Sequence, residues 1–401
     1  MQTIFDMAKV EDRDEALEFA NYVFSHDYDP RDFGPMLPKI FRRENFMDGM
    51  HYLAREGGKI VSMVGAYPLE MRIACGKGGF VPLPGRSVGM VCTHPQARGR
   101  GLMTALLKTA MADMAREGIA FACLSEESER YGRFGFAPGQ IVHTFSCDGE
   151  GIARALGGDW KTGLSLEQVG ERDGARGGAL LDGIHALHEA KPARMKRERA
   201  KLHDILSSWE QQAFALTEGG RVEGYMLYNQ YGNSISEIAL KDISRLPEAI
   251  GLFLREHGRG DVEIVVHAHE PEKIARLSAF CEKRGVDCGD QFAILDCARV
   301  VGALVGLKAA QTRPSAGSFT FEVEDERLGL ASKTRIFVGA DGAGAEKAGA
   351  GEKAALKMGA TEAARFLFAP ASEAPHRELR ESAFLRDILP LPISWETADG
   401  V

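Results

Sequence analysis

The sequence lacks any long apolar run. No uninterrupted stretch approaches the roughly 18 apolar residues that a membrane-spanning helix needs. The first ten residues, Met1–Val10, hold no basic segment followed by an apolar core, so no secretory signal is expected. These absences predict a soluble, cytoplasmic protein with no membrane partner.

Closely spaced cysteines are also missing. The 7 cysteines are dispersed over positions 75, 92, 123, 147, 281, 288 and 297, and no two form a C-x-x-C pair. Neither a disulfide framework nor a zinc knuckle is predicted, and reduced thiols are the simpler interpretation. His267 and His269 lie on one face of a strand pattern without a third ligand in view, so no metal is expected.

Long blocks of one charge are absent too. The chain carries 49 Lys+Arg against 57 Asp+Glu, a formal net charge of −8, with the two signs interspersed. This pattern argues against a nucleic-acid partner held by phosphate neutralisation. The one basic run, Arg194–His203, is interrupted by Glu198 and predicts a solvated helix face in preference to an anion site.

What is present predicts a mixed α/β chain of several domains. At roughly 150 residues per domain, 401 residues predict two or three domains. Strand patterns alternate with striped helical patterns, and we place the domains at 1–150, 151–286 and 287–401. In the last, small α/β domain, the small-residue tract from Ala340 to Lys353 is expected to be a mobile loop.

Two distant segments resemble each other. Tyr52–Met63 and Phe214–Tyr225 share an aromatic residue, Glu-Gly-Gly, a base and a β-branched residue at identical spacing. Each predicts a hairpin with its turn at the two glycines. Duplication and chance remain equally open on this pattern alone. If residues 151–286 are a second copy, that copy lacks the Gly/Arg loop described next.

The strongest local signal is a loop between a strand and a helix. Lys59–Ala74 predicts two strands and Gly85–Thr93 another, while Leu102–Gly118 has the apolar stripe of a helix packed on a sheet. In the loop, Gln96-x-x-Gly99-x-Gly101 exposes backbone N–H groups at the positive end of a helix dipole, and Arg98 and Arg100 add charge. Without Gly-Lys-Ser/Thr or a third glycine, the loop is neither a P-loop nor a dinucleotide fingerprint. We expect it to hold a pyrophosphate on another carrier.

At this loop the sequence resembles the GNAT N-acetyltransferases, whose Q/R-x-x-G-x-G/A loop cradles the pyrophosphate of acetyl-CoA. Tyr131-Gly-Arg-Phe-Gly-Phe136 resembles the family's Tyr-x-x-x-Gly-Phe segment, which presents a tyrosine near the thioester sulfur. The resemblance implies acetyl-CoA as the cosubstrate. It implies that the pantetheine arm lies along Val91, Cys92 and Thr93, and that the pyrophosphate is held by Arg98, Gly99, Arg100, Gly101, Leu102, Met103 and Thr104.

The chain also resembles the Eis-type (enhanced intracellular survival) acetyltransferases, for which Tyr131-Gly-Arg-Phe-Gly135 is typical. The resemblance is close over residues 85–139 and architectural elsewhere. Their architecture implies tandem GNAT folds, the second degenerate, followed by an α/β domain similar to sterol carrier proteins. The resemblance also implies a homo-oligomer and an amine acceptor on a small molecule or peptide, with aminoglycosides and lysine side chains as the substrate classes. A non-catalytic acyl-CoA or lipid-binding protein is the alternative function.

Two groups are candidates for proton transfer. Tyr131, neutral at pH 7 because a phenol has a pKa of about 10, is the candidate acid for the departing thiolate. Its alternative is a core tyrosine packed beside Phe134 and Phe136. In Eis-type enzymes the C-terminal carboxylate is the proton acceptor, usually on an aromatic last residue, whereas this chain ends in Val401. A frayed, solvated terminus is the alternative there.

Other reactive side chains receive structural interpretations. Cys123 lies in an apolar run without a nearby histidine, which predicts a buried, inert thiol. Glu126, Glu127 and Glu129 either attract a cationic amine or are the solvated acids that a helix N-terminus favours.

Overall fold

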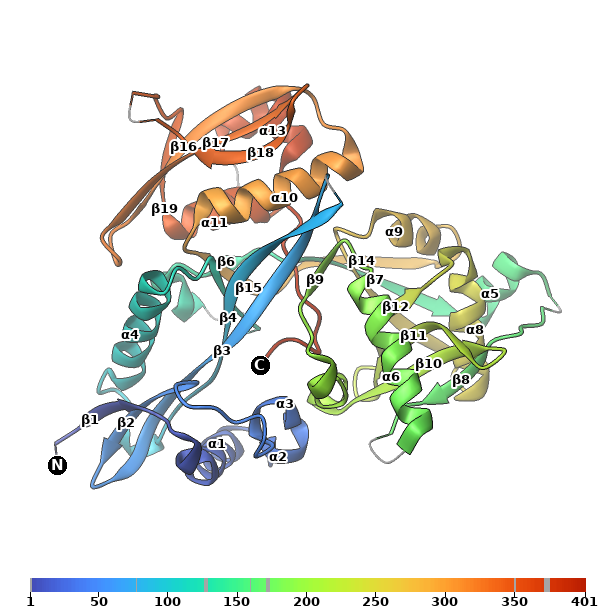
Figure 1. The fold of residues 1–401 in the computed structure, drawn as a ribbon, viewed down its shortest axis with the longest axis horizontal. Coiled ribbons are helices and arrows are strands. Elements are labelled where there is room, and N and C mark those ends of the chain that lie inside the picture. The colour runs from blue at the N-terminus through green and yellow to red at the C-terminus, as the bar shows by residue number, and fades with distance from the viewer. Residues whose placement is uncertain are drawn as a thin grey trace.

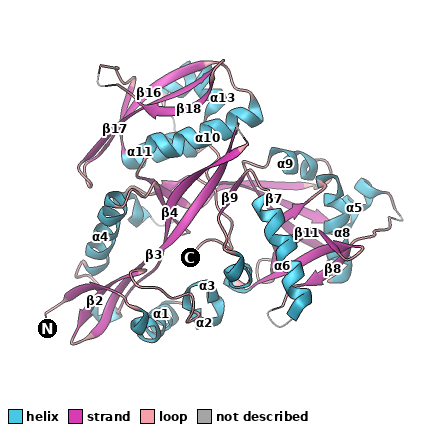
Figure 2. Ribbon diagram, in the orientation of Figure 1, coloured by secondary structure: helices cyan, strands magenta, loops and turns pink. Residues whose placement is uncertain are grey.

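The structure is a computed structural model that describes residues 2–76, 78–125, 129–158, 160–170, 174–349, 351–370 and 376–401, with only the backbone at residue 129. Its strands form three sheets with helices packed against them (Figures 1 and 2), a mixed α/β architecture as predicted. Within those ranges, the helices are too short or too polar to cross a membrane.

The first sheet has the strand order β1-β2-β3-β4-β5-β15-β6, and β9 pairs with β3. Its strands are β1 Ile4–Met7, β2 His51–Glu56, β3 Lys59–Cys75, β4 Gly79–Thr93, β5 Phe121–Leu124, β6 Ala137–Pro138, β9 Ala193–Met195 and β15 Gln291–Ile294. The helices of this part are α1 Arg13–Asp27, α2 Phe33–Met36, α3 Pro38–Phe41 and α4 Leu102–Arg116.

The prediction of two strands in Lys59–Ala74 is wrong, because β3 is continuous. Pro68 lies between the end of the β2 pairing at Gly65 and the start of the β9 pairing at Met71. On that side β3 has no neighbour at Pro68, so the missing N–H is tolerated.

The predicted strand–loop–helix–strand unit is confirmed. Strands β4 and β5 are parallel neighbours, and α4 connects them. The apolar stripe of α4 is buried in one core with residues of β2, β3, β4 and β5. This burial fixes the helix N-terminus beside the carboxyl end of β4.

The second sheet has the order β14-β7-β13-β12-β11-β10-β8. Its strands are β7 Ile141–Asp148, β8 Ser165–Gln168, β10 Gln211–Glu218, β11 Arg221–Asn229, β12 Ser234–Leu240, β13 Asp261–His267 and β14 Lys283–Cys288. Its helices are α5 Gly149–Leu156, α6 Gly174–Glu189, α7 Leu202–Leu206, α8 Leu246–Glu256 and α9 Pro271–Ser278.

The two larger sheets follow one plan. The first sheet is followed from β1 to β6 and the second from β8 to β14. In that order each sheet has three antiparallel strand pairs, then one parallel pair, then two further antiparallel pairs. Both predicted hairpins exist, and their Gly-Gly turns have matching φ values, 56° and 81° at Gly57 and Gly58 and 55° and 78° at Gly219 and Gly220. Positive φ at both positions requires glycine. The shared plan favours duplication over chance.

The two halves exchange a strand. β7 follows β6 in the chain but pairs with β13 and β14 of the second sheet. Conversely, β15 follows β14 but pairs with β5 and β6 of the first sheet. The boundaries predicted at 150 and 286 therefore assign both strands to the wrong sheet, while the division into three domains stays a prediction.

The third sheet has the order β18-β17-β16-β19, with strands β16 Gly317–Asp325, β17 Leu330–Gly339, β18 Gly342–Lys347 and β19 Leu356–Gly359. Its helices are α10 Cys297–Thr312, α11 Ala360–Phe368, α12 Arg377–Glu381 and α13 Ala383–Ile388. A mobile loop was expected at Ala340–Lys353, but β18 lies inside that tract. The small residues allow α10 to approach, since a Cβ on Gly302 would lie 3.0 Å from the Ala345 oxygen.

The prediction that all thiols are reduced is wrong for one pair. Cys147 on β7 and Cys281 after α9 form a disulfide. The two cysteines are separated by 134 residues, so their spacing gave no signal. Cys75, Cys92, Cys123 and Cys297 lie outside this disulfide.

Candidate active site

A cavity of about 840 Å³ opens in the first sheet at the carboxyl end of β4. All twelve residues predicted for cofactor binding or catalysis line it: Val91, Cys92, Thr93, Arg98, Gly99, Arg100, Gly101, Leu102, Met103, Thr104, Tyr131 and Val401. Segments from both ends of the chain thus meet in one space. The individual roles of these residues stay predictions.

The cavity exists because β4 and β5 separate. Their last paired residues are Ser87 and Cys123. Just beyond, Met90 has a φ of 49°, and the register of β4 against β3 shifts between Met63 and Gly65. Such a bulge bends a strand and increases its twist, which turns β4 away from its parallel neighbour.

Past this bulge, β4 presents backbone groups to the cavity. His94 N–H donates to Val61 O at 2.9 Å, and Cys92 O accepts from Ser62 Oγ at 3.2 Å, so both groups point toward β3. Because backbone groups alternate along a strand, the N–H groups of Val91 and Thr93 point to the other side, where β5 no longer pairs. This side suits the amide groups of a pantetheine arm.

The glycine loop offers further donors. Gly99 and Gly101 have φ values of 74° and 76°, and a Cβ on either would meet nothing within 4 Å, so conformation and not crowding requires glycine. The first intrahelical bond of α4 joins Ala105 N–H to Gly101 O. The N–H groups of the preceding first turn, and the positive end of the helix dipole, are therefore available to an anion.

The two loop arginines are paired, which corrects the expectation of free positive charge. Arg98 Nη2 lies 2.5 Å from Asp27 Oδ2 on α1, and Arg100 forms an ion pair with Glu56 on β2. Both arginine side chains are 43% exposed. Exposed pairs contribute little net stability, so a phosphate can compete with the carboxylates for either guanidinium.

Tyr131 is packed in the core and is also part of the cavity lining. It lies in a short 3-10 helix, Glu129–Phe134, is only 2% exposed, and packs edge-on against Phe136 with ring centroids 6.3 Å apart. It also lines the cavity. Its packing therefore fixes a phenol beside the open end of β4.

The C-terminus is buried, so the frayed terminus considered as an alternative is excluded. Val401 is 7% exposed, and its N–H donates to Ser87 Oγ at 3.3 Å. A Cβ built on Gly89 would come within 2.7 Å of a Val401 carboxyl oxygen. The terminal carboxyl group therefore lies against β4, between the bulge and the last residues paired with β5.

Two residues that sequence reasoning missed hold this terminus. Lys39 Nζ on α3 donates to Ala398 O at 2.6 Å and Gly400 O at 2.5 Å, and Trp209 Nε1 donates to Gly400 O at 2.9 Å. Burial lowers the pKa of Lys39 to about 7. Both residues lie at least 191 positions from their partners, so no local pattern marks them.

The remaining candidates have structural surroundings. Cys123 is fully buried, and burial raises its pKa, as expected for an inert thiol. His267 and His269 are hydrogen-bonded to Glu396 and Ser394 respectively. Glu126 and Glu127 and the side chain of Glu129 lie outside the described residues.

The basic run Arg194–His203 is not a solvated helix face. It begins in β9, and both Arg194 and Arg197 are buried. Arg194 Nη2 lies 3.0 Å from Glu189 Oε2, and Arg197 contacts Glu237 and Asp399. Arg197 pairs with acids distant in sequence, which no periodicity reveals.

Comparison with known proteins agrees with this geometry. Residues 5–139 match the family model of an acetyltransferase (GNAT) domain. No curated protein matches the chain in sequence.

Among solved structures, a probable N-acyltransferase of unknown function from Enterococcus faecalis is similar at 16% identity and a TM-score of 0.68, over 98% of both chains. A GCN5-related N-acetyltransferase from Kribbella flavida has 15% identity and a TM-score of 0.66, over 100% of this chain and 98% of the other. Eis1 from Mycobacterium abscessus has 14% identity and a TM-score of 0.64, over 99% of this chain and 98% of that one. The three-sheet fold is thus shared over the full length, and residues 5–139 are an acetyltransferase domain of the GNAT type.

Proposed function

We propose that the chain is an Eis-type N-acetyltransferase that transfers the acetyl group of acetyl-CoA to an amine in the first-sheet cavity. One observation carries the proposal. The glycine loop, the open side of β4, the Tyr131 phenol and the terminal carboxyl group of Val401 line the same cavity. Acyl transfer from acetyl-CoA to an amine requires a site for the pyrophosphate, backbone N–H groups for the pantetheine arm, a proton donor and a proton acceptor. These four features supply them in that order.

The cavity fits acetyl-CoA, which supplies the acetyl thioester. The first-turn N–H groups of α4 and the space above Gly99 and Gly101 suit a pyrophosphate. The N–H groups of Val91 and Thr93 bind the pantetheine amides and polarise the thioester carbonyl. Cys92 contributes its backbone only, because burial raises the pKa of its thiol.

Val401 serves as the proton acceptor. An amine must lose a proton before it attacks a carbonyl carbon, and a carboxylate held at the site accepts that proton. Val401 is 7% exposed and its carboxyl group lies against Gly89, so the carboxylate is held in place at the cavity wall. Tyr131 donates its phenolic proton to the departing thiolate.

The cavity lining near Val401 favours an amine substrate with an aromatic or apolar group. Phe24, Tyr28, Phe33 and Trp209 line this part of the cavity, and Phe24 packs edge-on against Phe33 at 5.1 Å. Asp27 is the one acidic side chain among the described lining residues, and it is paired with Arg98. These aromatic side chains suit an arylalkylamine or a lysine in an apolar peptide better than a polycationic aminoglycoside.

The experiment measures free-thiol release from acetyl-CoA with three classes of amine: an arylalkylamine, a lysine peptide and an aminoglycoside. We expect turnover with the first two classes and a kcat/KM at least tenfold lower with the aminoglycoside. Faster turnover of the aminoglycoside would contradict the acceptor class.

The competing function is a carrier of acyl-CoA or lipid that uses the third sheet as a sterol-carrier-like domain. A thermal-shift comparison of acetyl-CoA with fatty acids separates the two functions. Stabilisation by fatty acids alone, with no thiol release on any amine, would replace the transferase with the carrier. A symmetric homo-oligomer, checked by light scattering, belongs to the same Eis-type proposal.

A further inference from the structure

The second sheet has a strand separation equivalent to the one that opens the cavity of the first sheet. In the shared plan β12 corresponds to β4 and β13 to β5. The parallel pairing of β12 and β13 includes only Ser234 with Glu263 and Ile235 with Ile264, after which the two strands separate. Glu237 lies on β12 directly beyond this point, and His267 ends β13.

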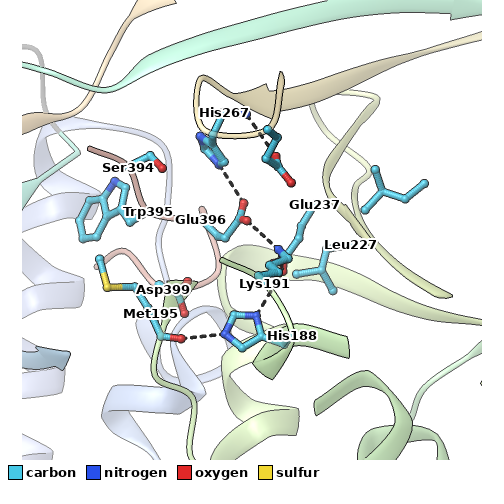
Figure 3. A network of polar contacts seen from close by, with 12 residues as sticks. His188, Lys191, Met195, Leu227, Glu237, His267, Ser394, Trp395, Glu396 and Asp399 are labelled. Carbon is cyan, nitrogen blue, oxygen red and sulfur yellow. Dashed lines mark hydrogen bonds and ion pairs between the residues drawn. The ribbon is translucent and has the colours of Figure 1, made fainter. Parts of the chain in front are cut away.

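Two acids of the C-terminal segment, Glu396 and Asp399, lie close to these strands. Figure 3 shows Glu396 between His267 and Lys191, with Asp399 nearby. We call the side chains of Lys191, Arg197, Glu237, His267, Glu396 and Asp399 the tail cluster. All six are at most 8% exposed.

Arg197 is the central cation of the tail cluster. Its Nε and Nη2 donate to the two carboxylate oxygens of Asp399 at 2.8 and 2.9 Å, which is a bidentate pair. Nη2 also donates to Glu237 Oε2 at 2.9 Å. A planar guanidinium satisfies this fork, whereas a lysine ammonium does not. Arg197 therefore ties the tail to β12 with a defined orientation.

Lys191 and His267 hold the other acid. Lys191 Nζ donates to Glu396 Oε1 at 2.8 Å and to Glu237 Oε1 at 2.6 Å. His267 Nε2 lies 2.8 Å from Glu396 Oε2. Just before Glu396, Gln140 makes two hydrogen bonds to the backbone of Trp395, at 3.0 and 3.1 Å. The tail is thus fixed at two acids before it reaches the first-sheet cavity.

The contacts of Arg197 with Asp399 also restrict the position of the terminal carboxyl group. Only Gly400 separates Asp399 from Val401, so the Arg197 fork constrains where the terminal carboxyl group lies. A misplacement of about 1 Å in a reacting group costs on the order of a hundredfold in rate.

We propose that the second sheet, where β12 and β13 separate, is a mount for the C-terminal segment through Glu396 and Asp399, and that Arg197 is a positioning residue for the Val401 carboxylate. This inference rests on the proposed function for its kinetic consequence. The mount itself is a structural claim that can be tested without catalysis.

The first test leaves the full-length protein unmutated. A carboxypeptidase is added, and release of free valine is followed. We expect release from the native protein to be at least tenfold slower than from the same protein unfolded in urea that the carboxypeptidase tolerates. We also expect the Val401 amide to show hydrogen-exchange protection similar to that of β12. Rapid valine release or an unprotected amide would overturn the mount.

The second test changes the fork. Arg197→Lys keeps the charge but loses the bidentate geometry, and Arg199→Lys is the matched control, since Arg199 pairs with Asp182 on an exposed surface. We expect Arg197→Lys to speed valine release at least tenfold and to lower kcat about tenfold with KM for acetyl-CoA unchanged. The control should match wild type in both.

A positioning role predicts non-additivity. In protein lacking Gly400 and Val401, Arg197→Lys should lower kcat no further, because the group it positions is gone. Multiplied losses would show that Arg197 acts through general stability and would overturn the positioning role. If the wild type transfers acetyl to no amine, the proposed function is wrong. Valine release still tests whether the second sheet holds the C-terminal segment.

Discussion

A carboxyl oxygen of Val401 lies against Gly89, so close that a Cβ on Gly89 would approach it to 2.7 Å. Gly89 pairs with Gly65 across β3 and β4, and the ring of Tyr67 covers Gly65 just as Val401 covers Gly89. At this point the sheet lacks side chains on both strands, which makes room for the chain terminus inside the first domain.

Gly89→Ala should therefore displace the terminal carboxyl group. We expect kcat/KM for the amine to fall about 10- to 100-fold, the range expected for misplacing a reacting group. Gly79→Ala is the matched control, because it lies on the same strand and its Cβ would meet only Cys75 Sγ at 3.7 Å. Steady-state kinetics of both variants decide the point, and equal rates would contradict the placement of Val401.

The glycine loop makes a prediction about cofactor affinity. Gly99→Ala places an L-residue at a φ of 74°, at a cost of about 1–2 kcal/mol. Gly118→Ala carries the same strain, at a φ of 72°, at the other end of α4. We expect similar losses of thermal stability but a raised KM for acetyl-CoA only for Gly99→Ala. Equal KM values for the two variants would remove the loop from cofactor binding.

Tyr131→Phe tests the proton donor. The substitution keeps the edge-on packing against Phe136 and removes only the hydroxyl. General acid catalysis contributes about 10²–10⁴-fold, so kcat should fall in that range. Tyr52→Phe is the control, since its hydroxyl bonds to Asp113 and lies outside the cavity lining. Wild-type kcat for Tyr131→Phe at its pH optimum would exclude the role.

The tail cluster predicts a pH dependence of stability. Burial alone would lower the pKa of His267, but the carboxylates of Glu396 and Glu270 outweigh burial and Lys191, and the net pKa is raised. A raised pKa means that protonated His267 stabilises the fold fully below its unfolded pKa of about 6.5. That contribution is lost as pH rises through the folded value.

His267→Gln should flatten this part of the curve of unfolding free energy against pH, because an amide keeps a donor for Glu396 but does not titrate. Urea unfolding between pH 6 and 9 measures the unfolding free energy at each pH. His26→Gln is the control, because the His26 side chain is 52% exposed. An unchanged slope in His267→Gln would show that the charge on His267 does not stabilise the tail.

Local sequence patterns predict much of the fold and the lining of the site. The stripe of α4, the glycine loop and the two Gly-Gly hairpins are each encoded within about 15 residues, because backbone conformation and amphipathic packing are local effects. Tyr131 is identified differently, from the resemblance of Tyr131–Phe136 to the family's Tyr-x-x-x-Gly-Phe segment.

The features that the sequence does not predict are contacts between residues far apart in the chain. The exchange of β7 and β15, the disulfide between Cys147 and Cys281, and the burial of Arg197 join segments that no periodicity connects. Arg197 and Asp399 are 202 residues apart, and Lys39 and Gly400 are 361 apart. A buried arginine reads as a surface residue in a sequence, because only the folded chain supplies its carboxylates.

The proposed acceptor of the amine proton is the main-chain carboxylate of Val401. Semisynthesis of the protein with a C-terminal carboxamide removes the charge and the basicity while keeping every other atom of the tail in place. The measurement is kcat/KM for the amine against pH, in the carboxamide and the native protein. We predict a loss of at least a hundredfold and an altered acidic limb, with unchanged melting temperature and acetyl-CoA affinity. A carboxamide protein as active as the native one would exclude the Val401 carboxylate as the proton acceptor.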